Sequence, residues 1–164
     1  MEADYVKSFL VASCAVLKSA ANIEVDIENT YLKSFTPHKD QVLFSAAIHG
    51  KYQGLVTLSM SKATACTIAC GMLQRASIPE LDELALSAIS EMANMILGNT
   101  MTMFSLTGVA LDISLSDFAG CPAILDCCPN PKTICVPLRA PSGNAIEFNL
   151  ALSNSPSYST PYLP

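Results

Sequence analysis

The longest uninterrupted helical pattern in the chain covers residues 78–106. At about 100° per residue, its apolar side chains fall on one face, which predicts that this face packs against the core. Pro79 and the acids after it predict the start of the helix, because proline and acidic residues favour helix N-termini. Gly108 predicts its end. We expect the rest of the chain to form a scaffold around this helix. The predicted core residues are Leu81, Ala85, Ala88, Ile89, Met92, Met95, Ile96 and Met103.

The opposite face of the same helix carries a small polar patch. Glu91 and Asn94 are three residues apart, so their side chains are neighbours on a helix. Asn has a low helix propensity, and Gly98 costs roughly 1 kcal/mol relative to alanine inside a helix. Because Ser87 and Gly98 are small, another backbone could approach the pair closely. The whole patch is Glu83, Ser87, Ser90, Glu91, Asn94 and Gly98.

The same patch also suits an ordinary solvated helix face, since polar residues on protein surfaces vary freely. Residue chemistry alone leaves both interpretations open.

Length and composition restrict the class of protein. A chain of 164 residues is long enough for one domain with a continuous core. Its mean hydropathy of +0.38 is high, but no apolar run approaches the roughly 18 residues of a membrane span. Only 9 Lys and Arg are present and the net charge is −5, so no basic stripe is available for nucleic acid. We therefore expect a soluble protein that binds neither membrane nor nucleic acid.

The cysteines and histidines do not suggest a metal or nucleophilic site. The seven cysteines are an odd number, and the N-terminus resembles no secretory signal, so we expect a cytoplasmic protein with free thiols. Cys66 and Cys70 lie in a helical pattern and are better explained as small buried hydrophobes than as metal ligands. His38 and His49 have no nearby carboxylate pattern. Glycine-rich phosphate loops and the G-x-S-x-G motif are absent from the sequence.

Hydrophobic periodicity predicts the remaining elements. A helix over residues 2–21 is followed by a strand that alternates from Ile23 and ends before Thr36. Strands at 41–49 and 53–60 should form a hairpin around the turn Gly50-Lys51. Ser61 is a good N-cap for a helix that runs to residue 76. Further strands are predicted at 109–115, 133–138 and 145–152, with a turn at 143–144.

This order predicts the α+β class, with a mostly antiparallel sheet of about six strands and about three helices packed on one of its faces. Residues 1–152 should form a single domain. Residues 153–164 are rich in Ser and Pro, without periodicity, and should form a flexible C-terminal tail.

The polar patch reads as Ser87-x-x-x-Glu91-x-x-Asn94 followed by MILGNTMTMFS, and it resembles the signature helix of the CheC, CheX and FliY family of chemotaxis phosphatases. CheC-type members usually carry two copies of this signature and this chain carries one, so it is most similar to CheX. The family pattern has a proline near the position of Ser116 and Asp117, where this chain departs from it. Other segments that resemble the family are YVKSFLVASCAVLKSAANIEV, GLVTLSMSKATACTIACGML, VALDISLSD and AIEFNLALS.

The resemblance implies hydrolysis of the aspartyl phosphate on a CheY-like response regulator. The regulator would bring its own Mg²⁺ and lysine, so this chain would need no cofactor of its own. Glu91 and Asn94 would be the catalytic residues, with Asn94 orienting the attacking water and Glu91 pairing with the regulator's lysine. Ser87 and Gly98 would be the partner-contact residues, whose small size leaves room for the regulator to approach the pair.

The resemblance also implies a homodimer formed through the sheets, as in CheX-type relatives. Two alternatives remain open at this stage. The chain could be a binding module that docks a response regulator or another signalling partner without turnover, or a structural dimerisation domain with an inert polar helix face.

Overall fold

The structure is a computed structural model of the chain, and it describes residues 2–34, 38, 40–50, 53–106, 108, 111–116 and 132–153. The predicted turn residue Lys51, the segment around Cys121, Asp117 and most of the predicted C-terminal tail lie outside these residues. Ser153, which we predicted to begin the tail, is instead the last residue of a strand.

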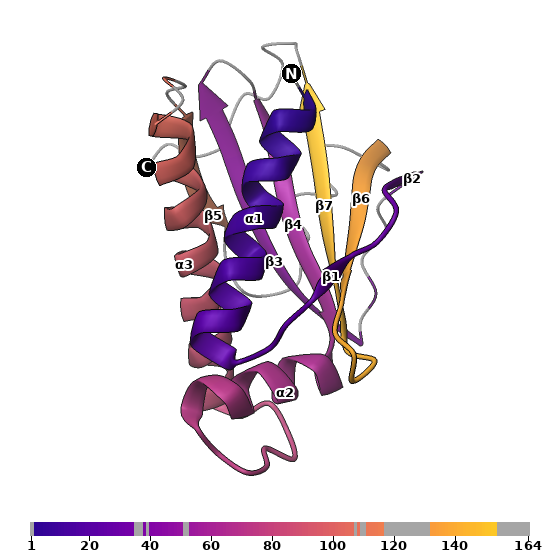
Figure 1. Cartoon of the computed structure of the whole chain (residues 1–164), viewed down its shortest axis with the longest axis vertical. Helices are drawn as coiled ribbons and strands as arrows, with labels where there is room; N and C mark the ends of the chain where they lie inside the picture. The colour runs from indigo at the N-terminus through magenta and orange to yellow at the C-terminus, as the bar shows by residue number, and fades with distance from the viewer. Residues whose placement is uncertain are drawn as a thin grey trace.

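The described residues form one antiparallel sheet of seven strands and three helices, which confirms the predicted α+β class. The sheet order is β1-β6-β7-β4-β3-β5, and β2 also pairs with β6. The helices lie together on one face of the sheet, with α1 and α3 side by side and α2 across their ends (Figure 1). The elements are α1 (Glu2–Ala21), β1 (Asp26–Ile27), β2 (Tyr31–Ser34), β3 (Gln41–Gly50), β4 (Gln53–Ser61), α2 (Lys62–Leu73), α3 (Glu83–Leu106), β5 (Leu111–Ser116), β6 (Lys132–Arg139) and β7 (Ala145–Ser153).

The predicted hairpin pairings are confirmed. β3 pairs antiparallel with β4 along its length, from Gln41 opposite Ser61 to Ile48 opposite Gly54. In the turn between β6 and β7, Gly143 has a φ of +88°, a left-handed conformation that suits glycine. The Gly143 N–H donates to the Ala140 carbonyl at 2.9 Å, which closes the turn.

The single strand predicted before Thr36 is wrong, because the structure divides it into β1 and β2. Both pair with β6, but residues 28–30 lie opposite only residues 136–137, so one residue is extra and the ladder is interrupted. Pro137 adds to the interruption because it has no N–H to donate. Its carbonyl still accepts a hydrogen bond from the Glu28 N–H at 2.9 Å.

The core lies between the helices and the sheet. Even-numbered side chains of β3, β4, β6 and β7 face the helices, as the period-two alternation of a strand requires. Phe9 of α1 stands at the centre, with ring centroids 5.2 Å from Phe148 and 5.9 Å from Phe104 of α3. This aromatic cluster joins both long helices to the sheet. None of the helices in the described ranges has both the length and the apolar character needed to cross a membrane.

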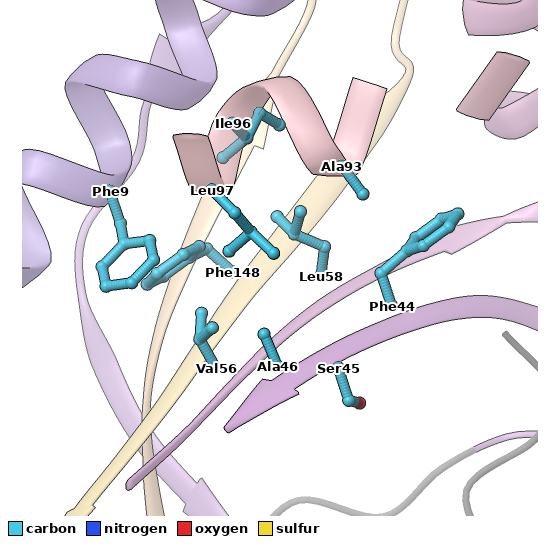
Figure 2. A pocket seen from close by; sticks show the side chains of 10 residues that line it. All are labelled: Phe9, Phe44, Ser45, Ala46, Val56, Leu58, Ala93, Ile96, Leu97 and Phe148. Atoms are coloured by element: carbon cyan, nitrogen blue, oxygen red, sulfur yellow. The ribbon is translucent and has the colours of Figure 1, made fainter. Parts of the chain in front are cut away.

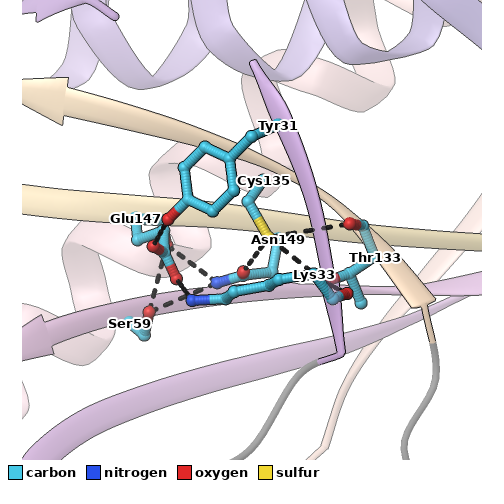
Figure 3. A network of polar contacts seen from close by, with 7 residues as sticks. All are labelled: Tyr31, Lys33, Ser59, Thr133, Cys135, Glu147 and Asn149. Atoms are coloured by element: carbon cyan, nitrogen blue, oxygen red, sulfur yellow. Dashed lines mark hydrogen bonds and ion pairs between the residues drawn. The ribbon is translucent and has the colours of Figure 1, made fainter. Parts of the chain in front are cut away.

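The opposite face of the sheet is polar. Glu147 of β7 accepts hydrogen bonds from the Tyr31 hydroxyl and the Lys33 ammonium group of β2 (Figure 3). Beside it, the Asn149 side-chain N–H donates to the Ser59 hydroxyl at 3.2 Å, and the Cys135 thiol donates to the side-chain oxygen Oδ1 of Asn149 at 2.9 Å. These contacts give the buried polar groups their partners and hold the short strand β2 on the sheet.

The boundaries of α2 differ in part from the prediction. Ser61 is the N-cap as predicted, and its hydroxyl accepts the Thr64 N–H at 3.1 Å. The helix ends at Leu73, three residues before the predicted end at Ala76. Gln74 is left-handed, with a φ of 52°, and its N–H donates to carbonyls of the last turn, a geometry that terminates helices.

Candidate functional site

The long helix α3 begins at Glu83, so the start predicted near Pro79 is wrong. Asp82 is the residue that caps it, because its carboxylate accepts the Ala85 N–H at 2.8 Å. At the other end, Gly108 has a φ of +74° and its N–H donates to the Ser105 carbonyl, so the predicted stop at Gly108 is confirmed.

One face of α3 is buried, but it is rotated from the predicted core face. Met95 is 36% exposed, which corrects its assignment to the core, while Leu81, which precedes the helix, and Met103 are partly buried against the core. The rotation follows from the neighbour on that side: α1 packs beside α3 and its Phe9 contacts Phe104. The prediction is confirmed at Ala85, Ala88, Ile89, Met92 and Ile96, while the buried residues Ala93, Leu97, Thr100 and Phe104 were missed.

The space beneath α3 is too small to be a ligand site. A cavity of about 10 Å³ lies between Ala93 and Leu97 of α3, Phe9 of α1 and the sheet residues Phe44 and Phe148 (Figure 2). This volume is about that of one water-sized sphere, and the lining is almost entirely apolar. The inner face of α3 therefore packs the helix against the sheet, and the outer face is the one that a partner can reach.

The outer face of α3 brings the four predicted site residues together. Ser87, Glu91, Asn94 and Gly98 are all exposed, and at about 100° per residue they fall within about 60° of one another. Neither Glu91 nor Asn94 makes a side-chain hydrogen bond or ion pair with another residue in the described part of the chain. Both polar groups are therefore available to a partner.

Gly98 leaves open space beside this pair. A Cβ atom built there would meet no atom within 4 Å, so nothing inside the described fold requires a glycine at this position. The Thr102 hydroxyl donates to the Gly98 carbonyl at 2.9 Å, which satisfies the acceptor on this turn. The glycine keeps the surface low on the C-terminal side of Asn94, and Ser87 does so on the N-terminal side.

The described thiols are free, and burial makes three of them less reactive. Cys14, Cys66, Cys70 and Cys135 form no disulfide, as predicted, while the other three cysteines lie outside the described residues. Burial raises the pKa of Cys14, Cys66 and Cys135, so these thiols stay protonated near neutral pH and are poor nucleophiles.

The described histidines and acidic residues do not gather into a metal site. His38 is exposed, with its Nδ1 atom 3.7 Å from Oδ2 of Asp40, and His49 is half-buried in β3. Within the ranges that the structure describes, no three His, Cys, Asp or Glu side chains are grouped so that they could hold a metal ion.

Comparison with known proteins connects this helix to a family. The family model described as chemotaxis phosphatase CheX matches residues 42–118, a segment that contains the whole of α3. A search of curated proteins gave no match.

Several solved structures share the fold. A chemotaxis protein CheX from Vibrio vulnificus has a TM-score of 0.72 and 17% identity, with 92% of this chain and 99% of that chain covered. A CheC-like superfamily protein from a Shewanella species has a TM-score of 0.71 and 21% identity, with coverage of 92% and 99%. CheX from Borrelia burgdorferi, solved in a complex with CheY, BeF3 and Mg²⁺, has a TM-score of 0.69 and 22% identity, with coverage of 90% and 97%.

At these identities the solved structures establish a shared fold, and the family model adds a match in sequence through the helix that carries the candidate site. Together they confirm that this chain resembles the CheC, CheX and FliY family, and CheX in particular.

Proposed function

We propose that this chain is a phosphatase that hydrolyses the aspartyl phosphate of a CheY-like response regulator in chemotaxis or related two-component signalling. The observation that carries the proposal is the exposed pair Glu91 and Asn94, one turn apart on α3 and without a partner among the described residues. The match to the chemotaxis phosphatase model and the likeness to a CheX that was solved with CheY support it.

Asn94 positions the attacking water. A neutral carboxamide cannot accept a proton at pH 7, but it offers one acceptor oxygen and two N–H donors. It can therefore hold a water molecule in line with the bond to be broken, as a glutamine does in GTPases. Orientation of this kind supplies part of the roughly 7 to 11 kcal/mol that is available to well-positioned reactants.

The reaction balances without a cofactor held by this chain. The water oxygen bonds to phosphorus while the bond between phosphorus and the aspartyl oxygen breaks. The regulator recovers its aspartate carboxylate, and the water's protons leave with inorganic phosphate and with solvent. The Mg²⁺ that neutralises the phosphoryl oxygens belongs to the regulator, and Glu91 and Asn94 enter its pocket from outside.

Glu91 anchors the insertion. A carboxylate paired with the lysine of the regulator's pocket makes a charge-assisted contact, which is stronger than a neutral hydrogen bond. Because Glu91 lies one turn before Asn94, this contact fixes how deeply the carboxamide enters. It also discriminates between partners, since a pocket without a cation would leave the carboxylate unpaired.

The test is phosphate release from a CheY-type regulator that has been charged with acetyl phosphate. The wild type should accelerate release, and Asn94→Ala should reduce the acceleration by at least about 100-fold, because a positioned group is lost. Asn99→Ala is the matched control, since Asn99 is also exposed on α3 but lies on another side of the helix. Equal rates for wild type and Asn94→Ala would refute the proposed role.

The variant Glu91→Gln separates anchoring from water positioning. The amide has nearly the same size as the carboxylate but carries no charge, so the affinity for the phosphorylated regulator should fall. The rate at saturation should change less than the affinity. Glu80→Gln is the control, because Glu80 is exposed and precedes α3. Binding by the wild type with no phosphate release at all would favour the alternative of a non-catalytic binding module.

We also propose that the chain forms a homodimer through its sheet edges and acts in the cytoplasm, where its proposed partner resides. Among the described strands, β1 and β2 border one edge of the sheet and β5 borders the other. Leu32 of β2 is 72% exposed, and an exposed apolar edge strand favours pairing with another chain.

A further inference from the structure

Three large apolar side chains of α3 are exposed, and two of them, Leu84 and Met95, interrupt its polar outer face on either side of Glu91, while the third, Leu106, is the last residue of the helix. Leu84 is 46% exposed and Met95 is 36% exposed. Leu84 lies seven residues before Glu91 and Met95 lies four residues after it, so the three side chains follow one row along the helix. At 1.5 Å per residue, the row from Leu84 to Met95 is about 16 Å long.

The fold does not account for this row. Met92 and Ile96, which lie on the same turn of the helix as Met95, are buried, so the core is filled on that turn without Met95. Single exposed apolar residues are common, but here two of them stand in line with an unpaired carboxylate. Methionine is enriched at protein interfaces, which combine apolar contacts with a limited number of direct hydrogen bonds.

The charge on α3 restricts what can cover the row. The helix carries two acidic residues, Glu83 and Glu91, and no Lys or Arg between residues 83 and 106. Its outer face is therefore complementary to a surface whose centre is cationic and whose surroundings are apolar. The proposed response regulator supplies such a centre in its receiver domain, the part that carries the phosphorylated aspartate, where Mg²⁺ and a lysine lie in the pocket.

We infer that Leu84 and Met95 form an apolar docking row that contacts the rim of the receiver's phosphorylation pocket on either side of Glu91. This inference rests on the proposed function and adds two positioning residues to it. The two contacts bind the receiver and set the tilt of α3, and they do not touch phosphorus or the attacking water. They therefore act on the affinity for the phosphorylated regulator and not on the chemical step.

The test separates KM from kcat in steady-state phosphate release, with the phosphorylated regulator as substrate. Leu84→Ala and Met95→Ala should each raise KM by roughly five- to tenfold, the effect of losing a few buried methylene groups, and leave kcat within about twofold. Met95→Leu should recover most of the wild-type KM, because it restores an apolar side chain of similar volume. Val11→Ala is the control, since Val11 is 44% exposed on α1, away from the row, and should change neither constant.

Binding to a beryllofluoride-charged regulator provides a readout that needs no turnover. Weakened binding by Leu84→Ala and Met95→Ala, with unchanged binding by Val11→Ala, would support the docking row even if the wild type released no phosphate and the proposed activity failed. Turnover by the wild type that depends on Asn94, with KM and binding unaffected in both apolar variants, would overturn the docking row and leave the phosphatase in place. No binding by the wild type would overturn both.

Discussion

A Cβ atom on Gly71 would lie 2.1 Å from the carbonyl oxygen of Ala21. Gly71 is in the last turn of α2 and Ala21 is the last residue of α1, so the two helices meet backbone to backbone at this point. No side chain fits between them, because the obstacle is main chain and cannot rotate away.

We predict that Gly71→Ala destabilises the protein by about 1 to 3 kcal/mol, the usual range for overpacking, since the ends of α1 and α2 must separate. Urea denaturation of wild type and variant measures this difference. A variant as stable as the wild type would show that the two helix ends are free to move apart.

Gly98→Ala should have the opposite effect on stability. A methyl group at Gly98 meets nothing within 4 Å, and alanine is favoured over glycine in a helix, so the free energy of unfolding should rise by about 0.4 to 1 kcal/mol. If the partner needs the clearance, the more stable variant should release phosphate more slowly. Higher stability with unchanged release would show that Gly98 is not a contact residue.

Asp82→Ala removes the N-cap of α3. The Ala85 N–H then loses its carboxylate partner, and we expect a loss of about 0.5 to 2 kcal/mol of stability in thermal or urea unfolding. Asp82→Asn keeps an acceptor at the same position and should lose much less. Equal losses for the two variants would argue that charge, and not the capping hydrogen bond, is responsible.

The contact of Tyr31 and Lys33 in β2 with Glu147 in β7 should make stability depend on pH at the acidic end. Burial raises the pKa of Glu147, but the hydrogen bonds from Lys33 and Tyr31 outweigh burial, so its pKa lies below the ordinary 4.5. A depressed folded-state pKa gives stability that is present above the ordinary value and is lost as the pH falls through the folded-state value. The difference in unfolding free energy between wild type and Glu147→Gln should therefore shrink on acidification.

The hydrogen bond between Tyr31 and Glu147 should also make stability depend on pH at the alkaline end. The hydrogen bond to Glu147, followed by burial, raises the pKa of Tyr31 from 10.0 to about 12. A raised folded-state pKa gives stability that is present below 10.0 and is lost as the pH rises through about 12. Tyr31→Phe should remove this alkaline loss, as measured by unfolding across the same range. A wild-type profile identical to that of Tyr31→Phe would contradict the hydrogen bond.

Leu32→Lys tests the proposed homodimer. A charged side chain at this exposed edge position opposes pairing of two sheets, so the variant should sediment as a monomer where the wild type sediments as a dimer. Val11→Lys, on α1, should leave the wild-type state unchanged. A monomeric wild type would refute dimer formation, and a dimeric Leu32→Lys variant would place the interface elsewhere.

Helix ends and strand breaks show where sequence reasoning reaches its limit. Pro79 and Asp82 both carry signals for a helix start, and only the folded chain shows that the Asp82 carboxylate caps the first turn. The division of the strand before Thr36 depends on how β6 pairs with it, so the extra residue is visible only once residues 28–30 face 136–137. Local patterns cannot contain this information, because the partner lies about a hundred residues away.

The sequence by itself determined the alternation of the strands and the one-turn spacing of Glu91 and Asn94, because these depend on the fixed periods of the strand and the helix. The tertiary structure decided which side of α3 is buried. Helical periodicity places residues around an axis but does not orient that axis, and the packing of α1 through Phe9 and Phe104 turned Met95 to the outside. The tertiary structure also brought Lys33 to Glu147, a contact that the local sequence around neither residue predicts.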